Sequence, residues 1–191
     1  MSDPMRHVQV TPPTCEPVSM ADAKLHAKID ESADNNTVTA LIAAARKMAE
    51  SYTNRVFITQ TWKLFLDGAP CKSSLELPKA PLQSVTHIKS YDDSDAATTL
   101  DASNYFVDAM SRPGRIVLRS SGSWPTPERV ANGFEAQFIC GYGADADSVP
   151  AEIKQAILLI IAHLYEHRGD ANVEMPETAC MLLSPHKDWF I

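Results

Sequence analysis

The stretch PAEIKQAILLIIAHLYEHRG, residues 150–169, predicts a helix over residues 150–168 that is buried on nearly every side. Pro150 suits the first turn of a helix, where a missing N–H costs nothing, and Gly169 is a natural end. The large apolar side chains are spread around the whole circumference: Ile153, Ile157, Leu158, Ile160, Ile161 and Leu164. Such a helix is either the central core helix of its domain or packs against a neighbouring subunit. The periodicity leaves these two alternatives open.

Two more helices are expected earlier in the chain, at residues 20–29 and 35–54. In the second, apolar residues recur at spacings of three and four, which places them on one face: Leu41, Ile42, Ala45, Met48, Ala49 and Tyr52. The other face carries polar side chains, among them Arg46 and Glu50. Leu41 and Met48 therefore join the six residues above as candidates for the core or a subunit interface.

The character of the sequence changes to β between residues 57 and 140. Five segments are rich in β-branched or aromatic residues and are bounded by Pro, Gly, Asp or Asn: 57–66, 84–91, 104–108, 115–119 and 134–140. We read them as a small antiparallel sheet inserted between helices. The expected fold class is therefore α+β and mainly α, a bundle of a few helices with a small antiparallel β region.

The chain is expected to divide into three parts. Residues 1–18 are polar and rich in proline, which predicts an extended N-terminal arm, and residues 19–168 form the folded domain. Residues 169–191 form a C-terminal tail that closes with Trp189, Phe190 and Ile191. Three large apolar side chains at a terminus need cover, which makes them candidates for docking on a partner.

Composition restricts the classes of function. The formal net charge is −7 and no run of Lys or Arg occurs, which argues against tight DNA binding through phosphate neutralisation. The four cysteines are far apart, which favours reduced packing residues: Cys15, Cys71, Cys140 and Cys180. We expect no secretory leader and no membrane association, since the most apolar run, residues 156–162, is too short to span a bilayer.

One pattern suggests metal chemistry. His163, Glu166 and His167 match the H-x-x-E-H motif, in which two histidines bind zinc and the glutamate acts as a base. Glu174 or Glu177 could supply a third ligand. The motif also lies in the last turn of the expected helix, where histidines are favoured by the helix dipole alone. We therefore expect no catalytic residue, cofactor or metal, and keep a zinc-dependent hydrolase as the remote alternative.

A series of short strings resembles the head–tail connector, or adaptor, proteins of tailed bacteriophages. In chain order these are EPVS at 16–19, LIAAAR at 41–46, ITQTW at 58–62, LP at 77–78, PLQSV at 81–85, PGRI at 113–116, WP at 124–125, GYG at 141–143, VP at 149–150 and IKQAI at 153–157. The coverage is nearly end to end, although residues 169–185 match little. In that family the position of His167 is commonly not histidine, which weakens the zinc hypothesis.

The resemblance implies a structural protein of the virion neck rather than an enzyme. Residues 19–168 would be the connector domain, and the subunits would form a ring, expected to be a dodecamer, beneath the portal protein. The ring would bridge the portal to a tail-side stopper or tail-completion protein and would surround the channel without reading DNA sequence. Assembly would take place in the host cytoplasm. A tail-completion or DNA-packaging accessory protein is the alternative.

Overall fold

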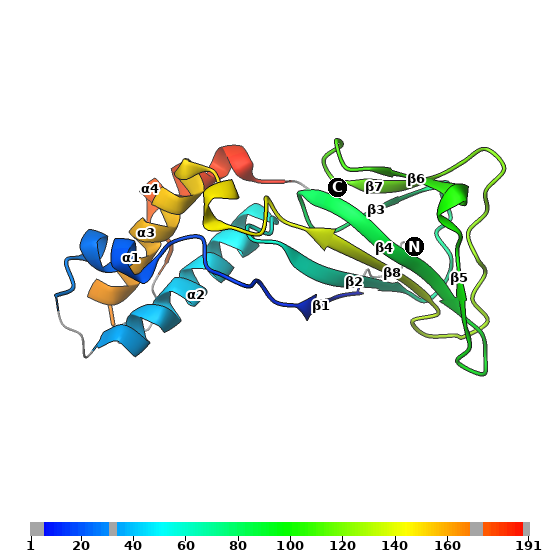
Figure 1. Ribbon diagram of the computed structural model, residues 1–191, viewed down its shortest axis with the longest axis horizontal. Helices are drawn as coiled ribbons and strands as arrows, with labels where there is room; N and C mark the ends of the chain where they lie inside the picture. The colour runs from blue at the N-terminus through cyan, green and yellow to red at the C-terminus, as the bar shows by residue number, and fades with distance from the viewer. Residues whose placement is uncertain (1–5, 31–33, 169–173, 189–191) are drawn as a thin grey trace. The chain divides into compact units, whose positions relative to one another are not determined.

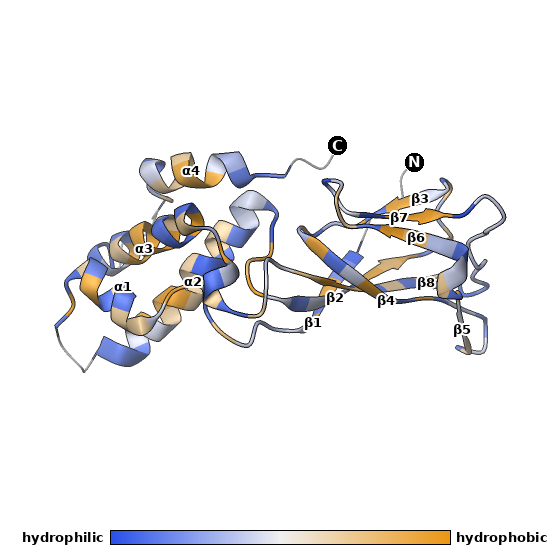
Figure 2. Cartoon of the chain, turned by 45° about the horizontal axis from the view of Figure 1, so that its top comes forward, coloured by the Kyte–Doolittle hydropathy of each residue, from blue (hydrophilic) through white to orange (hydrophobic). Residues whose placement is uncertain are grey.

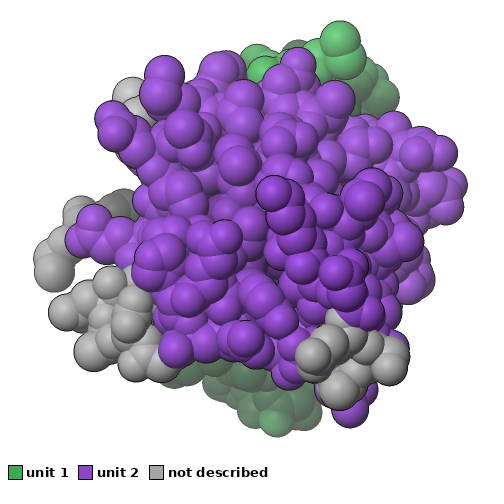
Figure 3. Space-filling model, turned by 90° about the vertical axis from the view of Figure 1, so that its left-hand side faces the viewer, with its two compact units in different colours: residues 1–12, 59–141, 190–191 green, residues 13–58, 142–189 purple. Residues whose placement is uncertain are grey.

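The computed structural model describes residues 6–30, 34–168 and 174–188 (Figure 1). The chain forms two compact units (Figure 3). Unit 1 comprises residues 1–12, 59–141 and 190–191, and unit 2 comprises residues 13–58 and 142–189.

Unit 1 consists of two antiparallel sheets. The larger has the strand order β1-β2-β8-β4-β5 and the smaller the order β3-β7-β6. The strands are β1 Arg6–Thr11, β2 Gln60–Leu66, β3 Ser74–Glu76, β4 Leu82–Tyr91, β5 Ala97–Thr99, β6 Tyr105–Asp108, β7 Arg115–Leu118 and β8 Phe134–Cys140. β8 is the central strand of the larger sheet, because it pairs with β2 on one side and β4 on the other.

The alternation of β8 builds the core of unit 1. Its residues Phe134, Ala136, Phe138 and Cys140 are fully buried. Ala136 lies opposite Leu64 of β2 and Ile88 of β4, and both of these side chains are fully buried as well. Three neighbouring strands thus present apolar residues to one face. The smaller sheet adds apolar residues along β6 and β7, visible in the hydropathy colouring (Figure 2).

Unit 2 is helical. Its helices are α1 Met20–Ala27, α2 Asn35–Thr53, α3 Ala151–Glu166 and α4 Glu177–Leu183. The Ser19 hydroxyl oxygen accepts a hydrogen bond from the backbone N–H of Asp22 at 3.1 Å, which caps α1. α2 ends at Asn54, whose φ of 56° is the left-handed conformation that commonly closes a helix. In the described parts of the chain, no helix combines the length and hydrophobicity needed to cross a membrane.

The prediction of a mainly α-helical fold was wrong. The described residues contain four α-helices and eight strands in two antiparallel sheets, which is a mixed α+β fold rather than a helical bundle with a small β insertion. The physical reason is the length of the elements. A helix of 16 to 19 residues shows its period plainly, whereas β3 and β5 have three residues each and show none.

Both ends of the described chain contain regular structure. Residues Arg6–Thr11, within the segment expected to be an arm, form β1 and pair with β2. Residues Glu177–Leu183, within the segment expected to be a tail, form α4, whose Ala179 and Leu183 are fully buried in the core of unit 2. The division of the chain at residues 18 and 169 stays a prediction.

Gly133 permits a close approach between backbone segments in unit 1. A Cβ atom at this position would lie 2.5 Å from the Arg129 carbonyl oxygen and 3.0 Å from that of Asp67. We expect Gly133→Ala to lower the free energy of unfolding by about 1–3 kcal/mol, since backbone atoms must shift to make room. Gly68→Ala is the matched control, because nothing lies within 4 Å of its added Cβ. Chemical denaturation followed by circular dichroism measures both; equal losses would contradict the prediction.

Candidate assembly surfaces

The candidate interface residues of α2 and α3 fall into two groups. Ile153, Ile157, Ile160 and Ile161 are fully buried within unit 2. α3 packs against α1, α2 and α4 of the same chain, so one subunit is enough to enclose these four side chains. The remaining candidates are partly buried against the same core: Leu41, Met48, Leu158 and Leu164. Their contact with a second subunit stays a prediction.

The suspected zinc motif lies at the end of α3. His163 and His167 place their ring centroids 4.2 Å apart, and His167 Nδ1 lies 2.9 Å from the His163 carbonyl oxygen, which accepts a hydrogen bond. Glu166 and His167 are exposed. Within the described ranges, no group of three His, Cys, Asp or Glu side chains could hold a metal ion. Glu174 and Glu177 therefore do not complete a site with the two histidines.

The apolar end of the chain, Trp189, Phe190 and Ile191, lies outside the described residues. The segment that leads to it is held by backbone contacts at the end of α2. The Asp188 N–H donates to the Thr53 carbonyl at 2.9 Å, and Asn54 Nδ2 donates to the Asp188 carbonyl at 3.1 Å. The Lys187 ammonium lies 4.6 Å from the centroid of the Tyr52 ring. The described part of the chain thus ends at a fixed position beside the end of α2.

A buried ion pair strengthens this attachment. Arg55 Nη2 donates to Asp188 Oδ1 at 2.8 Å, and the two side chains are only 3% and 8% exposed. Arg55 Nη1 also donates to the Tyr142 hydroxyl at 2.6 Å. Burial would lower the pKa of Arg55, but the hydrogen bonds to Asp188 and Tyr142 raise it above its usual value. Arg55 Nε and Asp188 Oδ2 are buried without a hydrogen-bond partner among the described residues.

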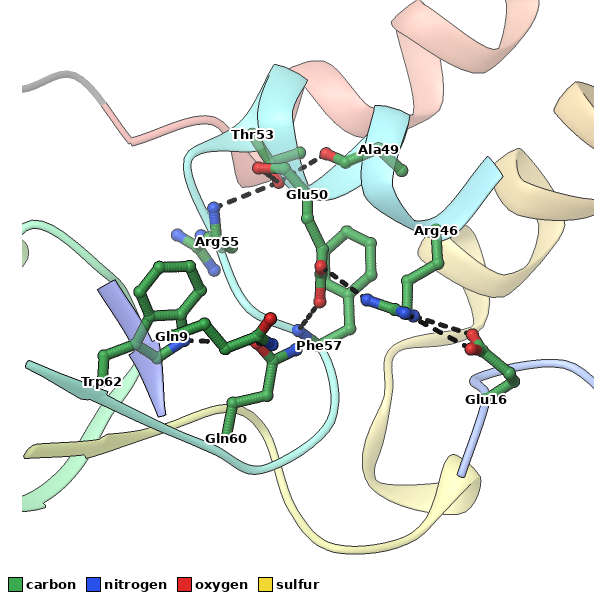
Figure 4. Close-up of polar contacts among 10 residues, drawn as sticks. All are labelled: Gln9, Glu16, Arg46, Ala49, Glu50, Thr53, Arg55, Phe57, Gln60 and Trp62. Atoms are coloured by element: carbon green, nitrogen blue, oxygen red, sulfur yellow. Dashed lines mark hydrogen bonds and ion pairs between the residues drawn. The ribbon is translucent and has the colours of Figure 1, made fainter. Parts of the chain in front are cut away.

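A second buried arginine ties the N-terminal segment to α2 (Figure 4). Arg46 is 5% exposed, and its Nε donates to Glu16 Oε2 at 2.7 Å while its Nη1 donates to Glu50 Oε2 at 2.9 Å. Glu50 Oε1 in turn accepts from the Phe57 N–H at 3.0 Å. Burial would lower the pKa of Arg46, but the two carboxylates raise it. Arg46 was placed on a polar outer face by its helical position, and the structure shows instead that it is buried.

Little in the sequence indicates the hydrogen-bond networks of Arg46 and Arg55. An arginine in an amphipathic helix ordinarily lies on the solvated side, and its burial depends on carboxylates that are distant in sequence. Glu16 is 30 residues from Arg46, and Asp188 is 133 residues from Arg55. The one local signal is Glu50, which follows Arg46 by four residues and so lies on the same side of α2.

A buried carboxylate joins three strands of the larger sheet. Glu135 of β8 is 3% exposed and lies within hydrogen-bond distance of His87 Nε2 at 2.7 Å, Lys63 Nζ at 3.0 Å and the Tyr91 hydroxyl at 3.1 Å. Burial alone would raise the pKa of Glu135, but the bonds from His87, Lys63 and Tyr91 outweigh it and hold the pKa below its usual value.

This low pKa predicts part of the acid sensitivity of the fold. Because the carboxyl group of Glu135 binds a proton less readily in the folded than in the unfolded chain, its stabilising effect is present above the ordinary pKa of 4.5 and is lost as the pH falls through the lower folded value. We expect Glu135→Gln to flatten the fall of the unfolding free energy in this acid range. Denaturation of both proteins between about pH 7 and pH 3 measures the effect. Identical acid profiles would contradict it.

The two edge strands of the larger sheet are the most exposed of the described strands in unit 1. All six residues of β1 are exposed, with Val8 at 55% and Val10 at 48%. Its side-chain contacts include the His7 ring, 5.7 Å from that of Trp62, the Arg6 guanidinium, 4.0 Å from Asp67 Oδ1, and Gln9 Nε2, which donates to Gln60 Oε1 at 2.6 Å (Figure 4). All three residues of β5, at the other edge of the same sheet, are also exposed.

The sequence model of the head completion protein family matches residues 17–176. This match covers most of the chain, and the chain therefore belongs to the head completion protein family. Membership confirms the resemblance to phage head–tail connector proteins that the sequence strings carried. Comparison with curated protein sequences gave no match.

Solved structures of gene transfer agent (GTA) particles share the fold. A chain in the neck of an empty GTA particle, computed with C6 symmetry, superposes with a TM-score of 0.81 at 23% identity over 98% of this chain and 96% of that one. A chain of the native gene transfer agent virion gives 0.81 at 22% identity over 98% and 97%. A chain in the neck of the native particle, computed with C12 symmetry, gives 0.72 at 23% identity over 98% and 96%.

Proposed function

We propose that this protein is a structural head–tail connector subunit that forms a ring in the neck of a tailed phage, prophage or phage-like particle. The observation that carries the proposal is membership of the head completion protein family, together with a fold shared end to end with chains from particle necks. The likeness to neck proteins extends over nearly the whole chain and not only over one part of it. We infer on the same grounds that the protein is not an enzyme.

The ring is expected to contain twelve subunits. Two of the similar neck structures were computed with C6 and C12 symmetry, and both are compatible with twelve copies around one axis. Repeated copies in a closed ring must contact one another through two different surfaces, one on each side of the subunit. The portal on the head side and a stopper or tail-completion protein on the tail side are the partners proposed for this ring.

The charge of the protein fits a passage for DNA better than a binding site for it. A formal net charge of −7 repels phosphates, so DNA can move past the subunits without being held. A tail-completion or packaging accessory protein would differ from this proposal in its partner rather than in its fold.

The first test is the mass of the purified protein in solution. Static light scattering on the full chain should give a species of about 250 kDa for twelve subunits of 21.0 kDa, and negative-stain images should show closed rings. Protein that remains monomeric should form the ring when purified portal is added. If neither the protein alone nor the mixture with portal contains a ring, the proposal is wrong.

We propose that the C-terminal residues Trp189, Phe190 and Ile191 dock on the portal protein. A truncation tests this only if it leaves the rest of the fold intact. Removing residues 187–191 would also remove Asp188 and leave Arg55 buried without its carboxylate. A chain that stops after Asp188 keeps this ion pair and lacks only Trp189, Phe190 and Ile191. We expect it to melt like the full chain and to lose at least tenfold in portal affinity, about 1.4 kcal/mol, by pull-down or interferometry. Unchanged affinity would show that the portal contact lies elsewhere.

A further inference from the structure

The outer edge of β1 carries little protection against pairing with another strand. Among the described residues its strand neighbour is β2 alone, and all six of its residues are exposed. Proteins commonly protect such an edge with lysine, proline or a β-bulge; neither lysine nor proline occurs between Arg6 and Thr11, and the pairing with β2 shifts register only between Gln9 and Thr11. The exposed Val8 and Val10 make the strand well suited to a β partner.

The other edge of the same sheet is open in the same way. The Asp92 N–H donates to the Ala96 carbonyl and the Leu100 N–H to the Ile88 carbonyl, so the even-numbered residues of this segment face β4. The backbone groups of Ala97 and Thr99 consequently point away from β4. Their small side chains leave room for the valines of an incoming strand.

The two edges carry opposite charge. Residues 92–101, which contain β5 and the turn before it, include four aspartates and no Lys or Arg, and among the described residues only Asp95 of the four forms an ion pair, with Arg129. Residues 6–11, which form β1, include Arg6 and no carboxylate; burial and the nearby Lys79 lower the pKa of His7, so the positive charge of this strand comes from Arg6. The Arg6 side chain remains 55% exposed beside Asp67. The positive charge of β1 is therefore attracted to the acidic residues 92–101 of another copy and repelled by that copy's β1.

We propose that β1 of one copy pairs with β5 of the next, so that the larger sheet continues from subunit to subunit. The inference rests on the proposed ring and names the contact that builds it. Since β1 and β5 lie at opposite edges, the contact is head-to-tail and can close a ring, whereas pairing of β1 with a second β1 would end at a two-fold dimer. Four antiparallel pairings separate the two strands, so both run in the same direction and the new junction is parallel.

Cross-linking distinguishes this contact from every contact within one chain. β1 and β5 are separated by three strands, which puts them about 19 Å apart in the same sheet. A bismaleimide linker shorter than that separation can join a cysteine at Val8 to one at Thr99 only between copies. The full chain is prepared as V8C, T99C and the V8C/T99C double variant, each with the exposed Cys71 replaced by serine.

The expected result is a ladder of covalent oligomers for V8C/T99C and monomer for each single variant after denaturing electrophoresis. Covalent dimers from V8C alone would show that two β1 strands pair, and would overturn the proposal. Concentrated double variant that gives no ladder would also overturn it. Light scattering on the same samples separates the proposed ring from the proposed β1–β5 contact. A ring without the ladder supports the connector function and contradicts the β1–β5 contact. A ladder without a closed ring supports only the β1–β5 contact.

Proline substitution tests the same edge without a cross-linker. Thr99→Pro removes an N–H that points away from β4, so the melting temperature should change little while the ring is lost. Thr98→Pro is the matched control, because Thr98 lies opposite Ser90 of β4 and its N–H points toward β4 within the sheet. We expect this second variant to lower the melting temperature as well. A Thr99→Pro protein that still forms the ring would refute the contact.

Discussion

Replacing Asp188 by alanine is expected to lower the free energy of unfolding by about 3–5 kcal/mol. The substitution leaves the Arg55 guanidinium buried at 3% exposure without its carboxylate. The expected loss is mainly the cost of that uncompensated charge, and only in part the loss of the bond itself. Urea denaturation of the two proteins, followed by circular dichroism, measures it.

Two further variants identify the cause. Asp95 also pairs with an arginine, Arg129, at 3.2 Å, but its side chain is 77% exposed. Asp95→Asn removes the charge while suiting the left-handed φ of 63° at this position, so it should cost no more than about 1 kcal/mol. The double variant Arg55→Met with Asp188→Leu removes both charges and should recover most of the loss seen in Asp188→Ala. A double variant as unstable as the single one would show that packing, rather than charge, holds this segment.

Phe138→Ala is expected to cost a similar amount, about 3–5 kcal/mol. Phe138 is fully buried on the central strand β8, between Trp62 of β2 and Val85 of β4. Neighbouring strands cannot close the cavity without breaking their pairing, so the lost contacts are not recovered.

The matched control for this substitution is another phenylalanine of unit 1. Phe106 on β6 is 52% exposed, and its ring lies 3.6 Å from the guanidinium carbon of Arg119. Phe106→Ala removes this contact but opens no cavity, so its cost should stay within about 1 kcal/mol. Equal costs for Phe138→Ala and Phe106→Ala by the same denaturation measurement would contradict the assignment of the core.

The sequence predicted the parts of the fold whose pattern is long enough to repeat. The alternation of residues 134–140 predicts one apolar face, and the structure buries Phe134, Ala136 and Phe138 on it. The apolar circumference of residues 150–169 predicts burial on nearly all sides; α1, α2 and α4 fully bury Ile153, Ile157, Ile160 and Ile161, whereas Leu158 and Leu164 are only partly buried. The short strands β3 and β5 were not predicted, because a segment of three residues is too short to show a period. The β content was therefore underestimated.

Most of the contacts made by the two buried arginines join residues far apart in sequence, which a local pattern does not show. Arg46 occupies the position of a solvated helix residue, and its burial depends on Glu16 from another segment as well as on Glu50 of the same helix. Arg55 likewise depends on Asp188. The family strings indicated the function more directly than any single residue did. The sheet edges that we propose as an interface became identifiable only with the strand order and the exposure of β1 and β5.

The exposure of β1 has a consequence for how such particles diverge. Its six side chains lie on the surface and backbone pairing with β2 holds the strand in place, so substitutions at these positions cost the fold little. Mutations can therefore accumulate there without being removed by selection for stability. If β1 pairs with β5 of the next copy as we propose, changes in these six side chains and in residues 92–101 would let two related particles that assemble in one cell exclude each other's subunits, while the rest of the protein stays the same.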